Sequence, residues 1–166
     1  VVEASRPFGG HLFVVPAWTL NEQREERRLT IVPRCEHVAA IHASHSRPFL
    51  AWCHLNDEAA LLRELLPDAL EVSGDDDDDE KIEKFDAFTR GQVRGLITKP
   101  KIGGFGLNWQ HCADLTMFPS HSYEQYYQSI RPCWRYGQTR EVFVDVVTTA
   151  GEADVAFGPV TDPAVD

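Results

Sequence analysis

The chain has 166 residues, of which 43% are hydrophobic and 25% charged, and its formal net charge is -10 at pH 7. This length and composition fit one folded domain, exclude a largely disordered chain, and leave no apolar run near the roughly 18 residues of a membrane span. The negative net charge also excludes a protein coated with positive charge for non-specific nucleic-acid binding, so any contact with a polyanion must be local.

The spacing of cysteines and histidines argues against a disulfide framework and against a bound metal. No two of the four cysteines form a CxxC pair, which is typical of reduced thiols in the cytosol. The N-terminal residues show no secretion signal, so we expect a cytoplasmic protein. Paired zinc-ligand spacing is lacking among His42, His45, Cys53 and His54, and we predict no metal site there.

The first 46 residues differ in character from the rest. Alternating acids and arginines predict an exposed helix over residues 21–28. A second helical piece is expected at 38–43, after Pro33 interrupts the chain. The domain proper is expected to begin at Arg47 and Pro48.

Strands and helices alternate from Pro48 onward, which predicts an α/β domain with a parallel sheet. Helices are predicted at 56–66, capped by Asn56, and at 80–90, ended by Gly91. Apolar runs predict strands at 49–53, 70–72, 93–98, 114–118 and 142–147.

Six consecutive acids, residues 75–80, precede the second of these helices, and the other residues sum to a charge of -4. A calcium loop is one interpretation, but it needs alternating ligands and a turn glycine within the run. Acids at a helix N-terminus complement the helix macrodipole. We therefore favour a solvated loop that caps the helix.

A further helix is predicted to begin at Ser122, with Gln125 completing a capping box. Tyr123, Tyr127 and Ile130 are expected on its inner side, because aromatic residues at this spacing are more often core than a base-stacking platform. Residues 151–166 are small, acidic and proline-containing, and are expected to form a flexible tail.

The run QSIRPCWRYGQ, residues 128–138, places an amide and two guanidinium groups on one face of this predicted helix. Gln128, Arg131 and Arg135 stand at i, i+3 and i+7 and so project in the same direction. Since arginine's planar fork suits phosphate oxygens, the run predicts an anion-binding site.

A second stretch with ligand-binding character begins where the predicted strand at 93–98 ends. Thr98 and Lys99 are followed by Gly103, Gly104 and Gly106. Glycines at the carboxyl end of a parallel strand let backbone amides approach a phosphate, although such a turn can also serve packing alone. A dinucleotide fingerprint in its required context, a P-loop and a D-E-x-[HD] box are all lacking, so the sequence has no triphosphate and magnesium site of its own.

Two stretches that contain these residues resemble the fifth and sixth motifs of superfamily 2 helicases: GLITKPKIGGFGLNWQHCADL and SYEQYYQSIRPCWRYGQTREVFV. The resemblance is greatest to Swi/Snf-type translocases and their bacterial and phage relatives, whose sixth motif runs Q-x-x-G-R-x-x-R-x-G-Q. Upstream, FLAWCHLNDEAALL and EVSGDDDDDEKIEKFDAF are similar to earlier segments of the same lobe, in the same order.

The resemblance implies a RecA-like, P-loop NTPase-type three-layer α/β/α domain over residues 47–150, which corresponds to the second of two helicase lobes. In that family ATP and Mg²⁺ are bound mainly by the first lobe. The implied partners are that first lobe and DNA, or RNA, with no membrane. Residues 1–46 would link to the first lobe, and the family members concerned imply the cytoplasm of a prokaryotic or phage-infected cell.

Residue by residue, the resemblance assigns a nucleotide site. Arg135 matches the arginine finger that contacts the γ-phosphate, and Gln128 would line the same cleft. Asn108 matches a polar residue near the ribose, and Gly104 and Gly106 would shape the loop.

The nucleic-acid contacts and one departure from the family pattern complete the assignment. Thr98 matches a threonine that contacts a nucleic-acid phosphate, and Lys99 is a further candidate by position. The family's first sixth-motif arginine falls at Pro132, while Arg131 takes the preceding glycine position and would reach the cleft from another angle. Pro132 also removes a backbone donor and favours a kink or a helix end.

Two functions remain open from the sequence. The first is the second lobe of an ATP-dependent DNA helicase or translocase, inactive by itself. The second is a degenerate, non-catalytic lobe that binds protein or nucleic acid, which Pro132 and the acidic balance favour.

Overall fold

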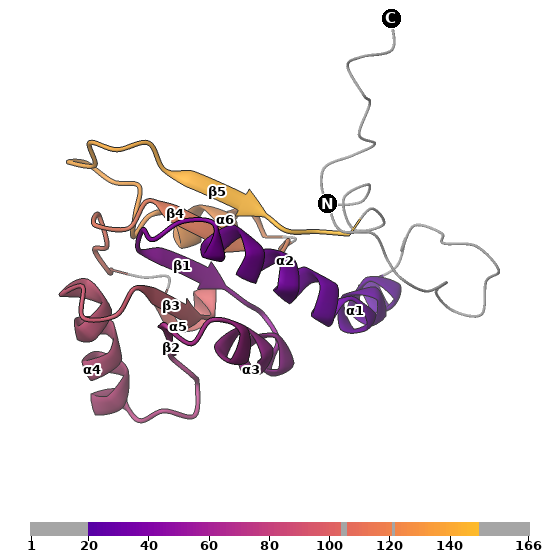
Figure 1. Cartoon of the computed structure of the whole chain (residues 1–166). Helices are drawn as coiled ribbons and strands as arrows, with labels where there is room; N and C mark the ends of the chain where they lie inside the picture. The colour runs from indigo at the N-terminus through magenta and orange to yellow at the C-terminus, as the bar shows by residue number, and fades with distance from the viewer. Residues whose placement is uncertain (1–19, 104–105, 121, 150–166) are drawn as a thin grey trace, which may run out of the picture.

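A five-stranded parallel sheet forms the centre of the molecule (Figure 1). The computed structural model describes residues 20–103, 106–120 and 122–149. The strand order is β2-β3-β1-β4-β5. The strands are β1 Phe49–Trp52, β2 Ala69–Glu71, β3 Gly95–Thr98, β4 Asp114–Met117 and β5 Phe143–Val146. The predicted strands are confirmed, with small shifts at their ends.

The strands run in register, so their carboxyl ends lie at one edge of the sheet. Trp52 at the end of β1 pairs with Thr98 on one side and with Met117 on the other. Met117 in turn pairs with Val146. The loops that follow these residues therefore gather at the edge where parallel sheets bind ligands.

Helices cover both faces of the sheet, so the domain has three layers (Figure 1). Helices α2 and α3 pack on one face, and α4, α5 and α6 pack on the other. Their bounds are α1 Leu20–Leu29, α2 Ile31–Ala43, α3 Asn56–Leu65, α4 Asp78–Thr89, α5 Pro100–Gly103 and α6 Tyr123–Ile130. The predicted α/β class and three-layer architecture are confirmed. Within the described ranges, no helix is long and apolar enough to cross a bilayer.

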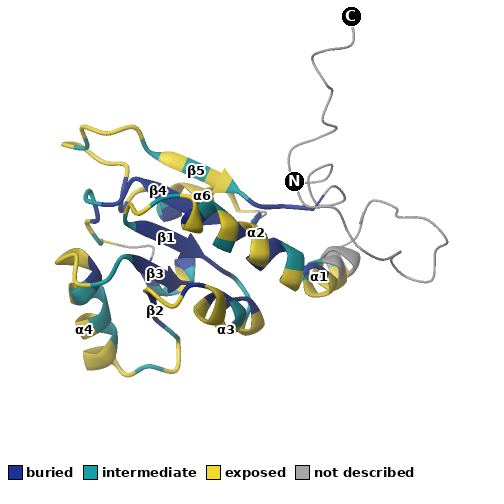
Figure 2. Cartoon of the chain, in the orientation of Figure 1, coloured by how far each residue is buried: buried dark blue, intermediate teal, exposed yellow. Residues whose placement is uncertain are grey.

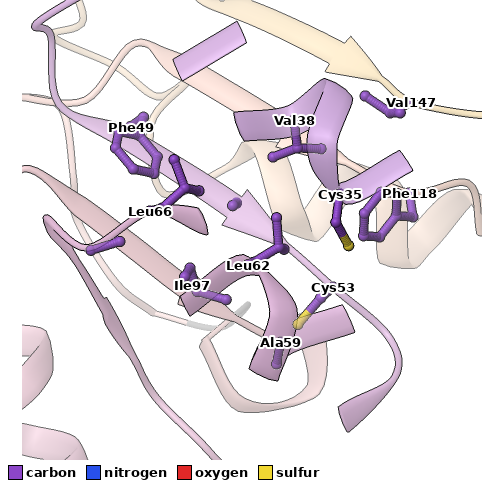
Figure 3. Packing of buried hydrophobic residues seen from close by; sticks show 12 residues of the cluster. Cys35, Val38, Phe49, Cys53, Ala59, Leu62, Leu66, Ile97, Phe118 and Val147 are labelled. Carbon is purple, nitrogen blue, oxygen red and sulfur yellow. The ribbon is translucent and has the colours of Figure 1, made fainter. Parts of the chain in front are cut away.

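Two apolar clusters hold the layers together, and strands β1 and β3, which are buried along their whole length, contribute to both, whereas β5 is partly exposed (Figure 2). In the first cluster, Val38 of α2 and Leu62 of α3 pack toward Ile97 of the sheet (Figure 3). In the second, Trp52 and Trp109 are buried against the opposite helices. Because β1 is apolar on both faces, it contributes to both clusters.

Helix α2 begins at Ile31, earlier than the sequence predicted. Pro33 is its third residue and lies in the first turn, where backbone N–H groups have no intrahelical acceptor, so the missing donor is tolerated. Cys35 and Val38 of this helix are buried in the first cluster. Helix α2 therefore contributes to the core, and the predicted link from residues 1–46 to another lobe stays a prediction.

The cap of α3 differs from the one predicted. Asn56 is the first helical residue and not the cap. Glu58 reaches back instead, and its Oε2 accepts hydrogen bonds from the backbone N of His54 at 2.9 Å and of Leu55 at 3.0 Å. The prediction was wrong because the Glu58 side chain folds back onto the N–H groups of the two residues before the helix, which leaves Asn56 free for another contact.

The acidic run caps α4, as predicted. Asp77 Oδ1 accepts a hydrogen bond from Glu80 N at 2.8 Å, and Glu80 Oε2 accepts one from Asp77 N at 3.3 Å. The helix ends at Thr89 with Arg90 as its cap, and the predicted stop residue Gly91 follows with a φ of 70°, which suits the left-handed residue after a helix end. Ile82, whose place in the predicted helix over 80–90 suggests an inner position beside Phe85 and Phe88, is instead exposed in the first turns of α4.

A buried ion pair joins α2 to α3. Arg34 Nη2 lies 3.0 Å from Glu58 Oε1, and both side chains are 0% exposed. Arg34 Nε also donates to Thr30 Oγ1 at 3.1 Å, and its guanidinium carbon lies 4.4 Å from the ring centroid of Phe118. Because an unpaired buried charge costs several kcal/mol, each partner of this pair depends on the other.

A buried histidine connects α2 to the sheet. His42 Nε2 lies 2.9 Å from Thr116 Oγ1, and the His42 ring stacks on Phe49 with 4.0 Å between centroids. Burial, with a smaller contribution from His45, lowers the pKa of His42 to about 3. His42 is therefore neutral in the folded protein near neutral pH.

Candidate functional site

Helix α6 carries the first of the predicted anion-binding residues. It begins after Ser122, whose Oγ accepts a hydrogen bond from Gln125 N at 3.2 Å, and it ends at Ile130. The predicted capping box is half formed, because Gln125 Oε1 accepts from Ser120 Oγ and not from the Ser122 backbone. The helix predicted to carry Gln128, Arg131 and Arg135 on one face ends earlier than this alignment requires, at Ile130.

The chain leaves α6 through a hydrogen-bonded turn. Arg131 is the cap residue, and Trp134 N donates to Ile130 O at 2.9 Å, which closes one more helical turn. Pro132 has no N–H to donate to the carbonyl of Gln128. The regular helix therefore ends just before Pro132, in agreement with the kink or helix end predicted at this residue.

The three predicted anion-binding residues nevertheless line one open pocket of about 190 Å³. Gln128 comes from the last turn of α6, Arg131 from its cap, and Arg135 from the turn that follows. The other described residues of the lining are Gly106, Leu107 and Pro132. The structure thus brings the three side chains together through a turn and not through one helix face.

Both guanidinium groups at this pocket are exposed and held by few contacts. Arg135 Nη1 donates to Leu107 O at 3.2 Å. The guanidinium carbon of Arg131 lies 5.7 Å from the ring centroid of Tyr127. Neither is paired with a carboxylate within the described part of the chain, so both keep their charge and most of their donors for an external anion.

Backbone and side-chain hydrogen bonds join the turn after α6 to the loop after α5. Trp109 N donates to Pro132 O at 2.7 Å, and Gln110 Nε2 donates to Tyr136 O at 2.7 Å. Gln138 Nε2 donates to Gln110 O at 2.9 Å. The two joined segments, called the site frame below, are residues 106–112 and 131–140.

Sequence reasoning missed the side chains that build this frame. Gln138 Nε2 also donates to Cys133 O at 3.0 Å, and Arg140 Nη2 donates to Gln110 O at 2.8 Å. Gln138 matches the last glutamine of the sixth-motif pattern that the sequence resembles, and this match was the available signal. Its partner carbonyl at Gln110 lies in a different motif, and spacing along the chain does not indicate that pairing.

The loop after α5 contains one position with a distinct backbone requirement. Gly106 has a φ of +76°, and nothing lies within 4 Å of the place where a Cβ would stand, so conformation and not space favours glycine. Gly104 lies outside the described residues. Asn108 is exposed and is not among the described residues of the pocket lining, so its predicted place near a ribose stays a prediction.

The two predicted nucleic-acid contacts lie at the carboxyl end of β3. Thr98 is 1% exposed, and its Oγ1 donates to Val72 O at 3.0 Å. In this conformation the hydroxyl faces the neighbouring strand and not the solvent. Lys99 Nζ donates to Asn56 Oδ1 at an exposed position, so its ammonium group is accessible to a phosphate.

Two buried thiols belong to the site frame. Cys112 and Cys133 are buried in the second apolar cluster. The contact with Cys112, together with burial, raises the pKa of Cys133 far above its usual range, which makes the thiol unreactive. No group of three histidine, cysteine, aspartate or glutamate side chains suited to a metal ion occurs among the described residues.

The pocket is chemically suited to one anionic group. An amide and two guanidinium groups converge on it, and the site frame fixes the backbone that carries them. Carboxylates that would hold a magnesium ion do not line it, among the residues described. The residues present therefore fit the phosphate end of a nucleotide and not its metal.

Comparison with known proteins shows a fold and no closer relationship. No protein-family model matches the sequence, and no curated protein matches it. The C-terminal part of the Fun30 ATPase domain is similar in structure, with a TM-score of 0.63 and 18% identity. The match covers 82% of this chain and 47% of that one, so the chain spans about half the length of that structure.

Two structures of the Dbp5 C-terminal domain are also similar. The S. cerevisiae domain bound to Gle1 and IP6 has a TM-score of 0.61 and 13% identity, with 75% of each chain covered. The C-terminal domain of the DEAD-box protein Dbp5 has a TM-score of 0.62 and 14% identity, with 75% of this chain and 74% of that one covered. At these identities the likeness shows the RecA-like fold of C-terminal helicase domains.

Proposed function

We propose that this chain is the second lobe of an ATP-dependent DNA helicase or translocase of the Swi/Snf type. It would form one side of an ATP site that it shares with a preceding RecA-like lobe, which would hold most of the ATP and the Mg²⁺. Bound ATP supplies the hydrolysable phosphoryl group. In this chain Arg135 would be the arginine finger, with Gln128 and Arg131 beside it and with Gly104, Gly106 and Asn108 in the adjoining loop.

The observation that carries the proposal is the convergence of Gln128, Arg131 and Arg135 on one pocket. These side chains come from the stretch that resembles the sixth helicase motif, and Gly106 and Leu107 come from the fifth. Trp109 N and Pro132 O join the two stretches directly. Charged donors without carboxylate partners would stabilise the charge on a transferring phosphoryl group.

Nucleic acid would be held at the carboxyl edge of the sheet. Lys99 is accessible there, whereas Thr98 must rotate its hydroxyl away from Val72 O before it can contact a phosphate. Such contacts read the backbone, so DNA and RNA would share them, and binding would weaken with salt and depend little on sequence.

A second candidate is a non-catalytic lobe that binds protein or nucleic acid. Pro132 stands where the family pattern has an arginine, and the Thr98 hydroxyl is used internally. One similar structure is a complex of the Dbp5 C-terminal domain with Gle1 and IP6, so a domain of this fold can bind a protein.

Steady-state ATP hydrolysis distinguishes the two candidates. We expect no turnover from this chain alone and DNA-stimulated turnover when the preceding RecA-like lobe is joined to it. In the two-lobe protein, Arg135→Ala should lower kcat about 10³-fold, as removal of other arginine fingers does. Arg90→Ala, at an exposed arginine after α4, is the matched control and should leave kcat unchanged.

Three results would contradict this scheme in different ways. Unchanged turnover in Arg135→Ala would remove the arginine-finger assignment. Robust hydrolysis by the chain alone would refute a shared site. An inactive two-lobe protein would favour the non-catalytic lobe.

A further inference from the structure

The outer side of α6 exposes aromatic rings that the sequence pattern assigned to the core. Tyr123 is 81% exposed and Tyr127 is 38% exposed. Beyond the helix, Trp134 is 55% exposed, and Tyr136 is also exposed. The expected inner position of Tyr123 and Tyr127 is therefore wrong, because the helix turns Ser129 toward the core instead.

Three of these rings share one strip of surface with an arginine. At about 100° per residue, positions 123, 127, 131 and 134 of a helix fall within roughly 80° of one another. The bond from Trp134 N to Ile130 O extends the helical geometry far enough for this spacing to apply. The side chains of this surface, called the aromatic stripe below, are Tyr123, Tyr127, Arg131 and Trp134.

The aromatic stripe runs along the rim of the anion-binding pocket. Arg131 belongs to the stripe and to the pocket. Its guanidinium group lies over the Tyr127 ring, and Arg131 is one of the residues that line the pocket. Tyr127 precedes Gln128 in the chain, and Trp134 precedes Arg135. At about 100° per residue, Gln128 and Arg135 point to the side of the rings, so the stacking surface and the phosphate-binding groups lie next to each other and meet at Arg131.

Positive charge is concentrated in the part of the chain that contains α6. Residues 99–140 contain five lysines and arginines and two acids, a net charge of +3, whereas the remaining residues carry -13, which together make the total of -10. One of the two acids, Asp114, accepts hydrogen bonds from Arg47 Nε at 2.8 Å and from Arg47 Nη2 at 2.5 Å. The other acid, Glu124, lies on α6 itself, so residues 122–140 carry three arginines and one acid, a net charge of +2, and this segment favours a polyanion although the whole chain is acidic.

The exposed apolar side chains of this surface are all of one chemical type. Among the described residues between 99 and 142, every large apolar side chain that is exposed is aromatic. Exposed leucine, isoleucine and methionine are lacking among these described residues. Aromatic rings set beside positive charge are the combination that binds single strands, because every base has a face that stacks.

We propose that the aromatic stripe binds single-stranded nucleic acid, with bases stacked on its rings and a phosphate held by Arg131. The single strand fits because the bases of a duplex are stacked on one another and their faces are covered. A free nucleotide would occupy one ring, whereas the stripe offers three. This contact goes beyond the proposed function, whose backbone contacts lie at the edge of the sheet. It shares Arg131 with the proposed ATP site, but its stacking rings lie outside that pocket, and it needs no ATP and no second lobe.

Fluorescence anisotropy with the full 166-residue chain tests the proposal. The probes are a labelled oligothymidylate, an abasic oligonucleotide with the same number of phosphates, and a duplex of the same length, all at one salt concentration. We expect oligothymidylate to bind at least about fivefold more tightly than the abasic strand or the duplex, which is the lower end of the contribution of one stacked base.

Two variants locate the contact. Tyr127→Ala and Trp134→Ala should each weaken oligothymidylate binding by about fivefold or more and leave abasic binding unchanged. Tyr127→Phe keeps the ring and should bind as the wild type does. Phe143→Ala removes an exposed aromatic residue on β5, outside the stripe, and is the matched control. Circular dichroism checks that each variant is folded.

Equal affinity for oligothymidylate and the abasic strand would overturn the proposal and leave a backbone contact only. Unchanged affinity in both alanine variants would overturn it as well. If the chain binds no single strand, and the stripe becomes protected from solvent only when the preceding lobe is joined, the stripe is a protein interface. ATP hydrolysis is not measured here, so a failure of the proposed function leaves this result intact.

Discussion

The core under α2 and the surface around α6 use arginine in opposite ways. Arg34 is fully buried, faces Glu58 at 3.0 Å and lies over the ring of Phe118. Arg131 and Arg135 are exposed, and their contacts are one aromatic ring and one carbonyl. Arg34 uses its hydrogen-bond donors and its charge within the fold, whereas Arg131 and Arg135 leave most of theirs available to a ligand. Surroundings, and not residue type, separate the structural arginine from the two candidate ligand-binding ones.

The largest effect expected from this comparison is on stability. Arg34→Met should lower the free energy of unfolding by about 3–5 kcal/mol, because it leaves the Glu58 carboxylate buried without its cation. Arg135→Ala, in the same chain, should change it by less than about 0.5 kcal/mol, as exposed substitutions do. Urea unfolding followed by circular dichroism measures both. Equal losses in the two variants would contradict the distinction between the regions.

A smaller effect, confined to the core under α2, should appear in the free energy of unfolding when the pH is changed. The pKa of His42 is about 3 in the fold and ordinarily 6.5, so the unfolded chain takes up a proton below pH 6.5 that the folded chain does not. The stability contributed by neutral His42 is present above pH 6.5 and falls as the pH is lowered, by up to about 1.4 kcal/mol per pH unit.

Unfolding of the wild type and of His42→Gln at pH 7.0, 6.0 and 5.0 measures this contribution, with the pH values chosen roughly one unit apart across the window. The variant should lose less stability as the pH falls, because glutamine does not titrate. Other histidines with lowered pKa values remain in both proteins, so the difference between slopes isolates His42. Parallel pH profiles would show that His42 is not the group responsible.

The smallest effect concerns the site frame. Gln138→Ala removes the hydrogen bonds from Nε2 to Gln110 O and Cys133 O, and should cost about 0.5–1.5 kcal/mol. Hydrogen exchange should accelerate in residues 131–138 while the sheet stays protected. Gln92→Ala, at an exposed glutamine, is the control. Unchanged exchange in the turn would mean that the frame does not depend on Gln138.

Local signals explain what the sequence predicted well. The strands follow from apolar runs, and the start and end of α4 follow from Asp77 and Gly91, whose effects act within one turn. The cap of α3 and the early start of α2 were missed because Glu58 and Pro33 act through details of the first helical turn. Competing local interactions of similar strength decide such boundaries.

Tertiary contacts account for the remaining differences. The sequence predicted that Gln128, Arg131 and Arg135 act together, and the structure places them on one pocket, but the helix expected to align them ends before Arg135. The exposure of Tyr123 depends on which elements pack over α6, and periodicity alone does not contain that information. The pairing of Gln110 with the turn likewise depends on the approach of two distant loops.

The hydrogen bonds of the site frame have a consequence for how a ligand would arrive. Because Trp109 N donates a hydrogen bond to Pro132 O and Gln138 Nε2 donates one to Gln110 O, the backbone around the pocket is already held in place before any anion is present. Association would then immobilise only the long side chains of Arg131 and Arg135, so little conformational entropy is lost. Rotamer changes of exposed side chains take picoseconds to nanoseconds, so capture would follow each encounter without waiting for a loop to fold.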